Sequence, residues 1–152
     1  MSRSGYSDDL DPWELIKWRG QVASALRGKR GQAFLAEMLA ALDAMSEKRL
    51  IAHDLVKDGA VCAIGSVAVA RGIDVSQLDP DEPEQIAAAF GIAHQMAQEI
   101  VYMNDECSGN HRDQITVNGQ QRFQWRDDTP EERWQRMRDW IASQIKTAAN
   151  AI

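Results

Sequence analysis

A polar cluster at residues 102–113 holds the side chains of this chain that are best suited to catalysis or metal binding. Cys107 and His111 are four residues apart, and Asp105 lies close by. A zinc site needs three or four such ligands in fixed geometry, and a calcium loop needs a regular acidic pattern. Neither pattern is complete, and no nucleophile is paired with a base. The sequence therefore predicts a protein that is not an enzyme, with no catalytic residue, no metal and no cofactor.

Two cations, Lys29 and Arg30, stand between Gly28 and Gly31 just before a predicted helix. Backbone N–H groups and the positive dipole end at a helix N-terminus favour an anion. These two residues are therefore candidates for anion binding, and a nucleotide-binding sponge is one hypothesis for the function. A solvated turn between two helices is the simpler interpretation.

Residues 85–103 have the outline of a helix-turn-helix, with Ala87 four residues before Gly91 and apolar residues on both sides. In that motif the second helix enters the major groove of DNA and reads the bases. Here that helix has no lysine or arginine, and it would present His94, Gln95, Gln98 and Glu99. Because phosphate contacts supply much of the affinity for DNA, a nucleic-acid-binding regulator stays an alternative. Two core helices separated by a glycine are the simpler interpretation.

Aromatic residues give the best functional signal. Two tryptophan pairs have a spacing that does not place both members on one helical face: Trp13 with Trp18, and Trp134 with Trp140. Further aromatic side chains lie beside a predicted hairpin, where exposed rings suit a protein interface. We expect the tip of this hairpin to contact a protein partner through Asn118, Arg122, Phe123 and Trp125. Simple core packing of the aromatic residues is the alternative.

The elements that position these residues are predicted to be mainly helical. Apolar residues at helical spacing predict helices over residues 12–27, 31–45, 63–71, 83–90, 92–103 and 130–148. Thr129 and Glu132 predict a capping box at the start of the last of these helices. The Asn118-Gly119 pair between two alternating runs predicts a β-hairpin at residues 114–125. Residues 49–56 fit either a short strand, pairing with residues 60–62, or a short helix, and the strand is the preferred interpretation. The predicted fold class is mainly α, a single-domain bundle of about six helices with one β-hairpin.

The centre of this bundle is predicted to be Gly59–Gly72. From Ala60 to Ala70 only Gly65 and Ser66 interrupt an apolar run. A helix of this length spans only ~16 Å, much less than a bilayer requires. We therefore expect a buried core element around which amphipathic helices pack. The polar residues 1–10 are predicted to be flexible, and residues 11–152 to form the helical domain.

The composition narrows the classes of partner. The 152 residues carry a net charge of −6, which disfavours nonspecific binding to nucleic acid and to anionic membranes. The first residues are polar and have no apolar stretch typical of a signal peptide. We therefore expect a cytoplasmic protein in which Cys62 and Cys107 stay reduced.

The chain contains, in this order, the motifs Cys62-Ala-Ile-Gly65, Phe90-Gly-Ile92, Asn104-Asp105 and Thr129-Pro-Glu-Glu-Arg-Trp134. Together these four motifs resemble those of a family of small, uncharacterised phage and prophage proteins. The resemblance covers most of the chain and implies a virus-encoded accessory protein in the host cytosol. It transfers no catalytic residue, and residues 108–126 look like an insertion relative to the family. The favoured function is binding, and thereby inhibition, of a host factor or a bacterial immune protein.

Overall fold

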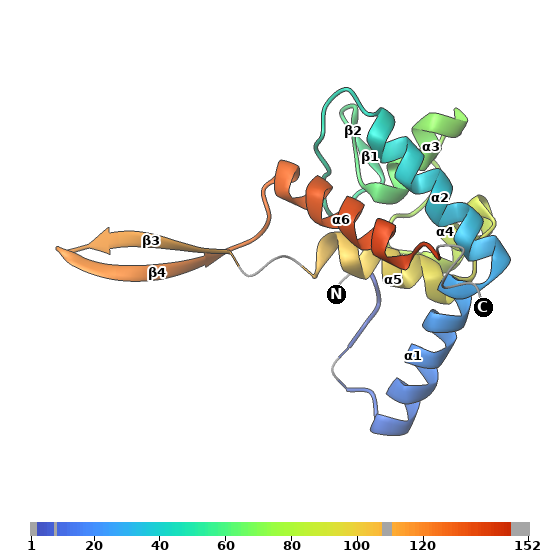
Figure 1. Cartoon of the computed structure of the whole chain (residues 1–152), viewed down its shortest axis with the longest axis horizontal. Helices are drawn as coiled ribbons and strands as arrows, with labels where there is room; N and C mark the ends of the chain where they lie inside the picture. Colours follow the sequence, from blue (N-terminus) through green and yellow to red (C-terminus); the bar gives the residue numbers. More distant parts are fainter. Residues whose placement is uncertain (1–2, 8, 108–110, 147–152) are drawn as a thin grey trace.

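The computed structural model describes residues 3–7, 9–107 and 111–146. Over these residues the chain forms one mainly helical domain (Figure 1), as the sequence predicts. The six helices are α1 (Pro12–Arg27), α2 (Lys29–Ala44), α3 (Ala63–Arg71), α4 (Pro83–Phe90), α5 (His94–Asp105) and α6 (Pro130–Gln144). Two antiparallel strand pairs complete the fold: β1 (Val56–Lys57) with β2 (Ala60–Val61), and β3 (His111–Val117) with β4 (Gln120–Arg126). None of the helices described is long and apolar enough to cross a membrane.

The helix ends follow local side-chain chemistry. The Asp11 carboxylate accepts hydrogen bonds from the backbone of Trp13 and Glu14 at the start of α1. At the start of α6, Thr129 and Glu132 form the reciprocal capping box that the sequence predicts. Helix α6 ends at Gln144, and residues 147–148 of the predicted helix lie outside the described residues.

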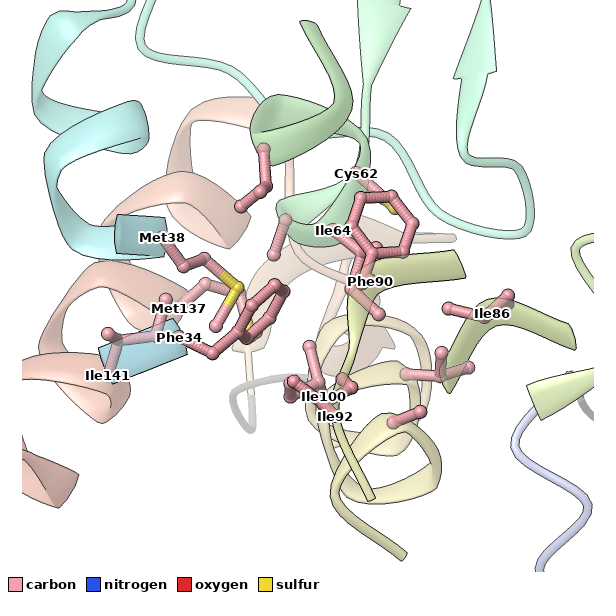
Figure 2. Close-up of a cluster of buried hydrophobic side chains, with 14 of the residues drawn as sticks. Phe34, Met38, Cys62, Ile64, Ile86, Phe90, Ile92, Ile100, Met137 and Ile141 are labelled. Carbon is pink, nitrogen blue, oxygen red and sulfur yellow. The ribbon is translucent and has the colours of Figure 1, made fainter. Parts of the chain in front are cut away.

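The N-terminal part of α3 contributes to the core (Figure 2), where the helix packs against α2, α5 and β2. Its residues Ala63–Ala68 are all buried, which confirms the predicted core element. A Cβ atom on Gly65 would lie only 1.9 Å from the Leu55 carbonyl oxygen, so glycine permits a close backbone contact here. The run is not buried throughout, because Val69 at the C-terminal end of α3 is exposed.

The strand predicted over residues 49–56 is mostly wrong. Only Val56–Lys57 pairs with Ala60–Val61. The backbone N–H of Leu50 instead donates to Pro130 at the start of α6. His53 has a φ of +74°, which interrupts an extended strand. The segment buries Leu50 and Leu55 as an irregular connection, because its backbone groups find partners on two different elements.

Within the N-terminal segment predicted to be flexible, Arg3 and Ser4 are buried. The Arg3 guanidinium donates two hydrogen bonds to the Asp105 carboxylate, at 2.8 and 2.9 Å. A few residues on, the Tyr6 hydroxyl donates to Glu99 and accepts from the indole of Trp18. A polar segment is buried here because its charges and hydroxyls have partners, which composition alone does not reveal.

Two elements project from the body of the molecule (Figure 1): the β3–β4 hairpin and the N-terminal half of α1. The other helices pack against α2 and α5. Both projections carry exposed apolar residues, which makes them the candidate contact surfaces of this fold.

Candidate interaction surface on the β3–β4 hairpin

The β3–β4 hairpin, termed the arm below, extends away from the helices as a free two-stranded ribbon (Figure 1). Its register pairs Val117 with Gln120 around a two-residue turn. Asn118 and Gly119 have φ values of +51° and +76°, as a turn with two left-handed central residues requires. None of the residues in its two strands is buried. The arm therefore adds nothing to the core and presents both of its faces to the surroundings.

One side of the arm, the aromatic face, carries two exposed rings. The cross-strand pairs Arg112–Trp125 and Gln114–Phe123 place these residues on the same side. Phe123 is 57% exposed and Trp125 is 65% exposed. The Arg112 guanidinium lies over the Phe123 ring, 4.0 Å from its centroid. The aromatic face is thus a row of apolar surface with a cation fixed upon it.

The opposite face is polar and charged. It carries Arg122 opposite Ile115, and an ion pair of 2.9 Å between Arg126 and Asp113. Of the four residues predicted to contact a partner, the structure therefore brings only Phe123 and Trp125 together. Arg122 lies on the other side, and Asn118 occupies the exposed tip.

Hydrogen bonds and ion pairs fix the base of the arm to α6. His111 Nε2 lies 2.6 Å from the buried carboxylate of Asp128, which also accepts a bond of 2.8 Å from Arg136. On the partner strand, Arg126 donates to Glu132 at 2.6 Å. Both strands are thus held where they leave the body, which limits the directions that the arm can take.

The chain enters the arm from the C-terminal end of α5. Two arginines of α6 hold this end of α5 in place. The buried Arg133 donates to the Asn104 and Leu50 carbonyls at 3.1 and 3.2 Å. Arg136 donates to the Met103 and Asn104 carbonyls. Cations favour a helix C-terminus, where the last carbonyls lack partners within the helix. The two helices that bracket the arm are therefore joined directly.

The charges at the base of the arm also lower the pKa of Glu132. Hydrogen bonds from Arg126 and from the backbone and hydroxyl of Thr129 lower the pKa of Glu132 to about 2. Glu132 therefore stays ionised at any pH above about 3, and its contact with Arg126 persists over the same range.

The polar cluster at residues 102–113 is divided between two sets of partners. Asp105 pairs with Arg3, whereas His111 pairs with Asp128 and Glu132 at the base of the arm. No group of three metal-ligating side chains occurs among the residues that the structure describes. Asp105 and His111 thus attach the N-terminal segment and the arm to the body.

The geometry gives little support to the other two predicted sites, the helix-turn-helix outline at residues 85–103 and the anion site at Lys29 and Arg30. The second helix of the helix-turn-helix outline is α5, and its Glu99 is buried and paired with Arg19 of α1 at 2.8 Å. His94 lies against Trp18 and Gln95 donates to Gln21, so α1 occupies part of the surface that would read bases. Lys29 and Arg30 lie in the exposed first turn of α2, which begins two residues earlier than predicted.

Sequence reasoning missed Arg112 and the residues that anchor the arm. The signal for Arg112 was present, because a two-residue turn at Asn118-Gly119 fixes the register and places Arg112 diagonally across from Phe123. The contacts of His111 and Arg126 with α6 depend on how the arm leaves the body, and no local pattern indicates that.

Comparison with known proteins finds no matching family model, no matching curated protein and no matching solved structure. A functional hypothesis therefore depends on the geometry of the arm.

Proposed function

We propose that this chain is a small phage-encoded accessory protein that binds another protein through the aromatic face of its arm. The partner is a host factor or a bacterial immune protein, which this binding inhibits. The observation that carries the proposal is the exposure of Phe123 and Trp125 on a ribbon that contributes no buried residue. The viral origin depends on the resemblance of four sequence motifs to those of phage proteins.

The arm has no structural role that accounts for its two rings. A two-stranded ribbon alone is only marginally stable in water, and exposed aromatic side chains favour aggregation unless something covers them. Trp and Arg are the residue types most enriched where protein interfaces have their largest binding energy. Trp125 and Arg112, paired across the strands, place both types side by side.

The fixed base makes the arm suitable for tight binding. Side chains and loops that become ordered only on binding reduce affinity, whereas a preorganised surface avoids that cost. Arg126 with Glu132, and His111 with Asp128, hold the arm before any partner arrives. The arm is also basic, with three arginines and one aspartate, in a chain of net charge −6. An acidic rim around an apolar depression is the complementary surface.

The test is affinity capture from a bacterial lysate with three versions of the protein. Phe123→Ala with Trp125→Ala removes both rings. Gln120→Ala with Gln124→Ala changes the opposite face and is the matched control. We expect the wild type and the control to capture the same protein, and the ring variant to lose it by at least about tenfold. Equal capture by all three versions, or no specific capture by any, would overturn the proposal.

A second candidate function, binding of single-stranded nucleic acid, is favoured by one observation. Arg112 over Phe123, beside Trp125, combines a cation with rings on which bases stack. Binding of labelled oligonucleotides that weakens steeply with salt, and that is lost in the ring variant, would select this function. No binding at low salt would dismiss it.

A further inference from the structure

The outward face of α1 is a second surface that the fold leaves without a partner. Val22 and Leu26 face the core, and the side of the helix opposite to them carries Trp13, Ile16 and Gly20. Trp13 is 71% exposed and Ile16 is 62% exposed. Residues that recur at intervals of three and four form one stripe along a helix, as in helices that pack against another helix.

Gly20 is the last residue of this stripe and lies near the middle of α1. A Cβ atom there would meet nothing within 4 Å. A glycine inside a helix costs about 0.5–1 kcal/mol relative to alanine, so the monomer alone would be more stable with a larger residue. Beside it lies a shallow hollow of about 710 Å³, lined by Lys17, Gly20, Gln21 and Ser24 of α1 and by Ala93 and Gln95. A glycine that opens such a hollow permits another helix to approach closely.

The charges along α1 indicate what that second helix is. The chain entering the helix is acidic, with Asp9, Asp11 and Glu14. The chain leaving it is basic, with Arg27 followed by Lys29 and Arg30, all exposed. One copy of α1 placed antiparallel to another brings the acidic end of each against the basic end of the other. The antiparallel arrangement also places the positive end of each helix dipole beside the negative end of the other, which is favourable.

We infer that two copies of this chain associate through an antiparallel contact of their α1 helices, which cross at Gly20. Trp13 and Arg27 are equally distant from Gly20 along the helix, so the Trp13 ring of one copy faces Arg27 of the other. Ile16 packs against the small residues around Ser24. Lys29 and Arg30, candidates for anion binding, receive the carboxylates of the second copy. The dimer leaves both arms free, so this inference is independent of the proposed function.

The test is the oligomeric state in solution, measured by sedimentation over a range of protein concentrations. We expect the wild type to dimerise below about 100 µM, and high salt to weaken the dimer. Gly20→Leu places a side chain where the two α1 helices would come closest, so it should weaken dimerisation by at least about tenfold. The thermal stability of the monomer should stay equal or rise, because leucine favours a helix more than glycine does. A wild type that stays monomeric at this concentration overturns the inference, and so does a Gly20→Leu variant that dimerises as well as the wild type.

A charge exchange tests the orientation. Lys29→Glu with Arg30→Glu should weaken the dimer by at least about tenfold, because acidic residues then meet at both ends. Adding Asp9→Arg to that variant should recover most of the loss, because Asp9 belongs to the acidic end that residues 29 and 30 of the other copy meet. Lys57→Glu with Arg122→Glu makes the same change of charge at two exposed residues outside α1, and this control should dimerise like the wild type. Failure of Asp9→Arg to restore any affinity overturns the antiparallel arrangement.

Discussion

Gly65 shows how a single residue determines the packing of a helix, here α3. Its missing side chain lets α3 approach the backbone of Leu55, which an added Cβ would meet at 1.9 Å. The sequence marks this glycine only as an interruption of an apolar run, and the close contact becomes visible in three dimensions. The motif Cys62-Ala-Ile-Gly65 is thus explained by packing and needs no chemical role.

We predict that Gly65→Ala destabilises the protein by about 1–3 kcal/mol or more, because the backbone of Leu55 must move. Chemical denaturation at a concentration that keeps the protein monomeric measures the change. Gly20→Ala is the matched control, since its Cβ enters open space within a helix. It should stabilise the protein by about 0.5–1 kcal/mol. Equal effects of the two substitutions would contradict the close approach at Gly65.

The buried ion pair of Arg3 and Asp105 makes the free energy of unfolding depend on pH. Burial by itself raises the pKa of Asp105, but hydrogen bonds and charge from Arg3, with a further bond from Asn104, more than offset this. The pKa of Asp105 therefore lies below its ordinary value of 3.8. A carboxylate whose pKa is lower in the folded state contributes stability above its unfolded pKa, and loses it as the pH falls through the folded value.

We predict that Asp105→Asn costs about 3–5 kcal/mol near pH 7, because it leaves the Arg3 guanidinium buried without its counter-charge. The difference between wild type and variant should stay constant above about pH 5 and shrink as the pH falls below 3.8. Urea denaturation of both proteins between about pH 2.5 and 7 measures it. A difference that does not change over that range would show that this ion pair is not made.

At the scale of elements, local chemistry explains which parts were predictable. The capping box of Thr129 and Glu132, and the turn at Asn118-Gly119, depend on residues within a few positions of one another, and both are confirmed. The contacts of the N-terminal segment and of residues 49–56 could not be predicted because their partners are distant in the chain. Arg3 pairs with Asp105, and Leu50 bonds to Pro130. Exposed rings beside the hairpin were expected from the sequence, but its alternating pattern usually indicates one buried face, so it did not show that neither face packs on the body.

We predict that the arm can be shortened without loss of the fold. His111 and Arg126 are cross-strand partners, so an Asn-Gly turn can replace residues 112–125 and still keep both anchoring residues. Because the deleted residues are not buried, the free energy of unfolding should change by less than about 1 kcal/mol. Thermal denaturation compares the two proteins. A loss of several kcal/mol would mean that the arm packs on the body.

At the scale of the whole molecule, a helical body supports two exposed surfaces of different kinds. The arm carries aromatic rings and positive charge, whereas α1 carries an apolar stripe between an acidic and a basic end. Asp105 and His111, which looked reactive in the sequence, serve to fix the N-terminal segment and the arm. A molecule with two such exposed surfaces is suited to binding other proteins, in agreement with the proposed function.

Photo-crosslinking from the arm tests that role most directly. A benzoylphenylalanine replaces Gln121, which shares the aromatic face with Phe123, and in a second protein it replaces the exposed Val69 on the body. Both are irradiated in the same bacterial lysate. We predict that position 121 crosslinks to one protein, and that the product disappears when Trp125 is changed to alanine. Crosslinking at position 69 but not at 121, or no specific product from the arm, would contradict the account.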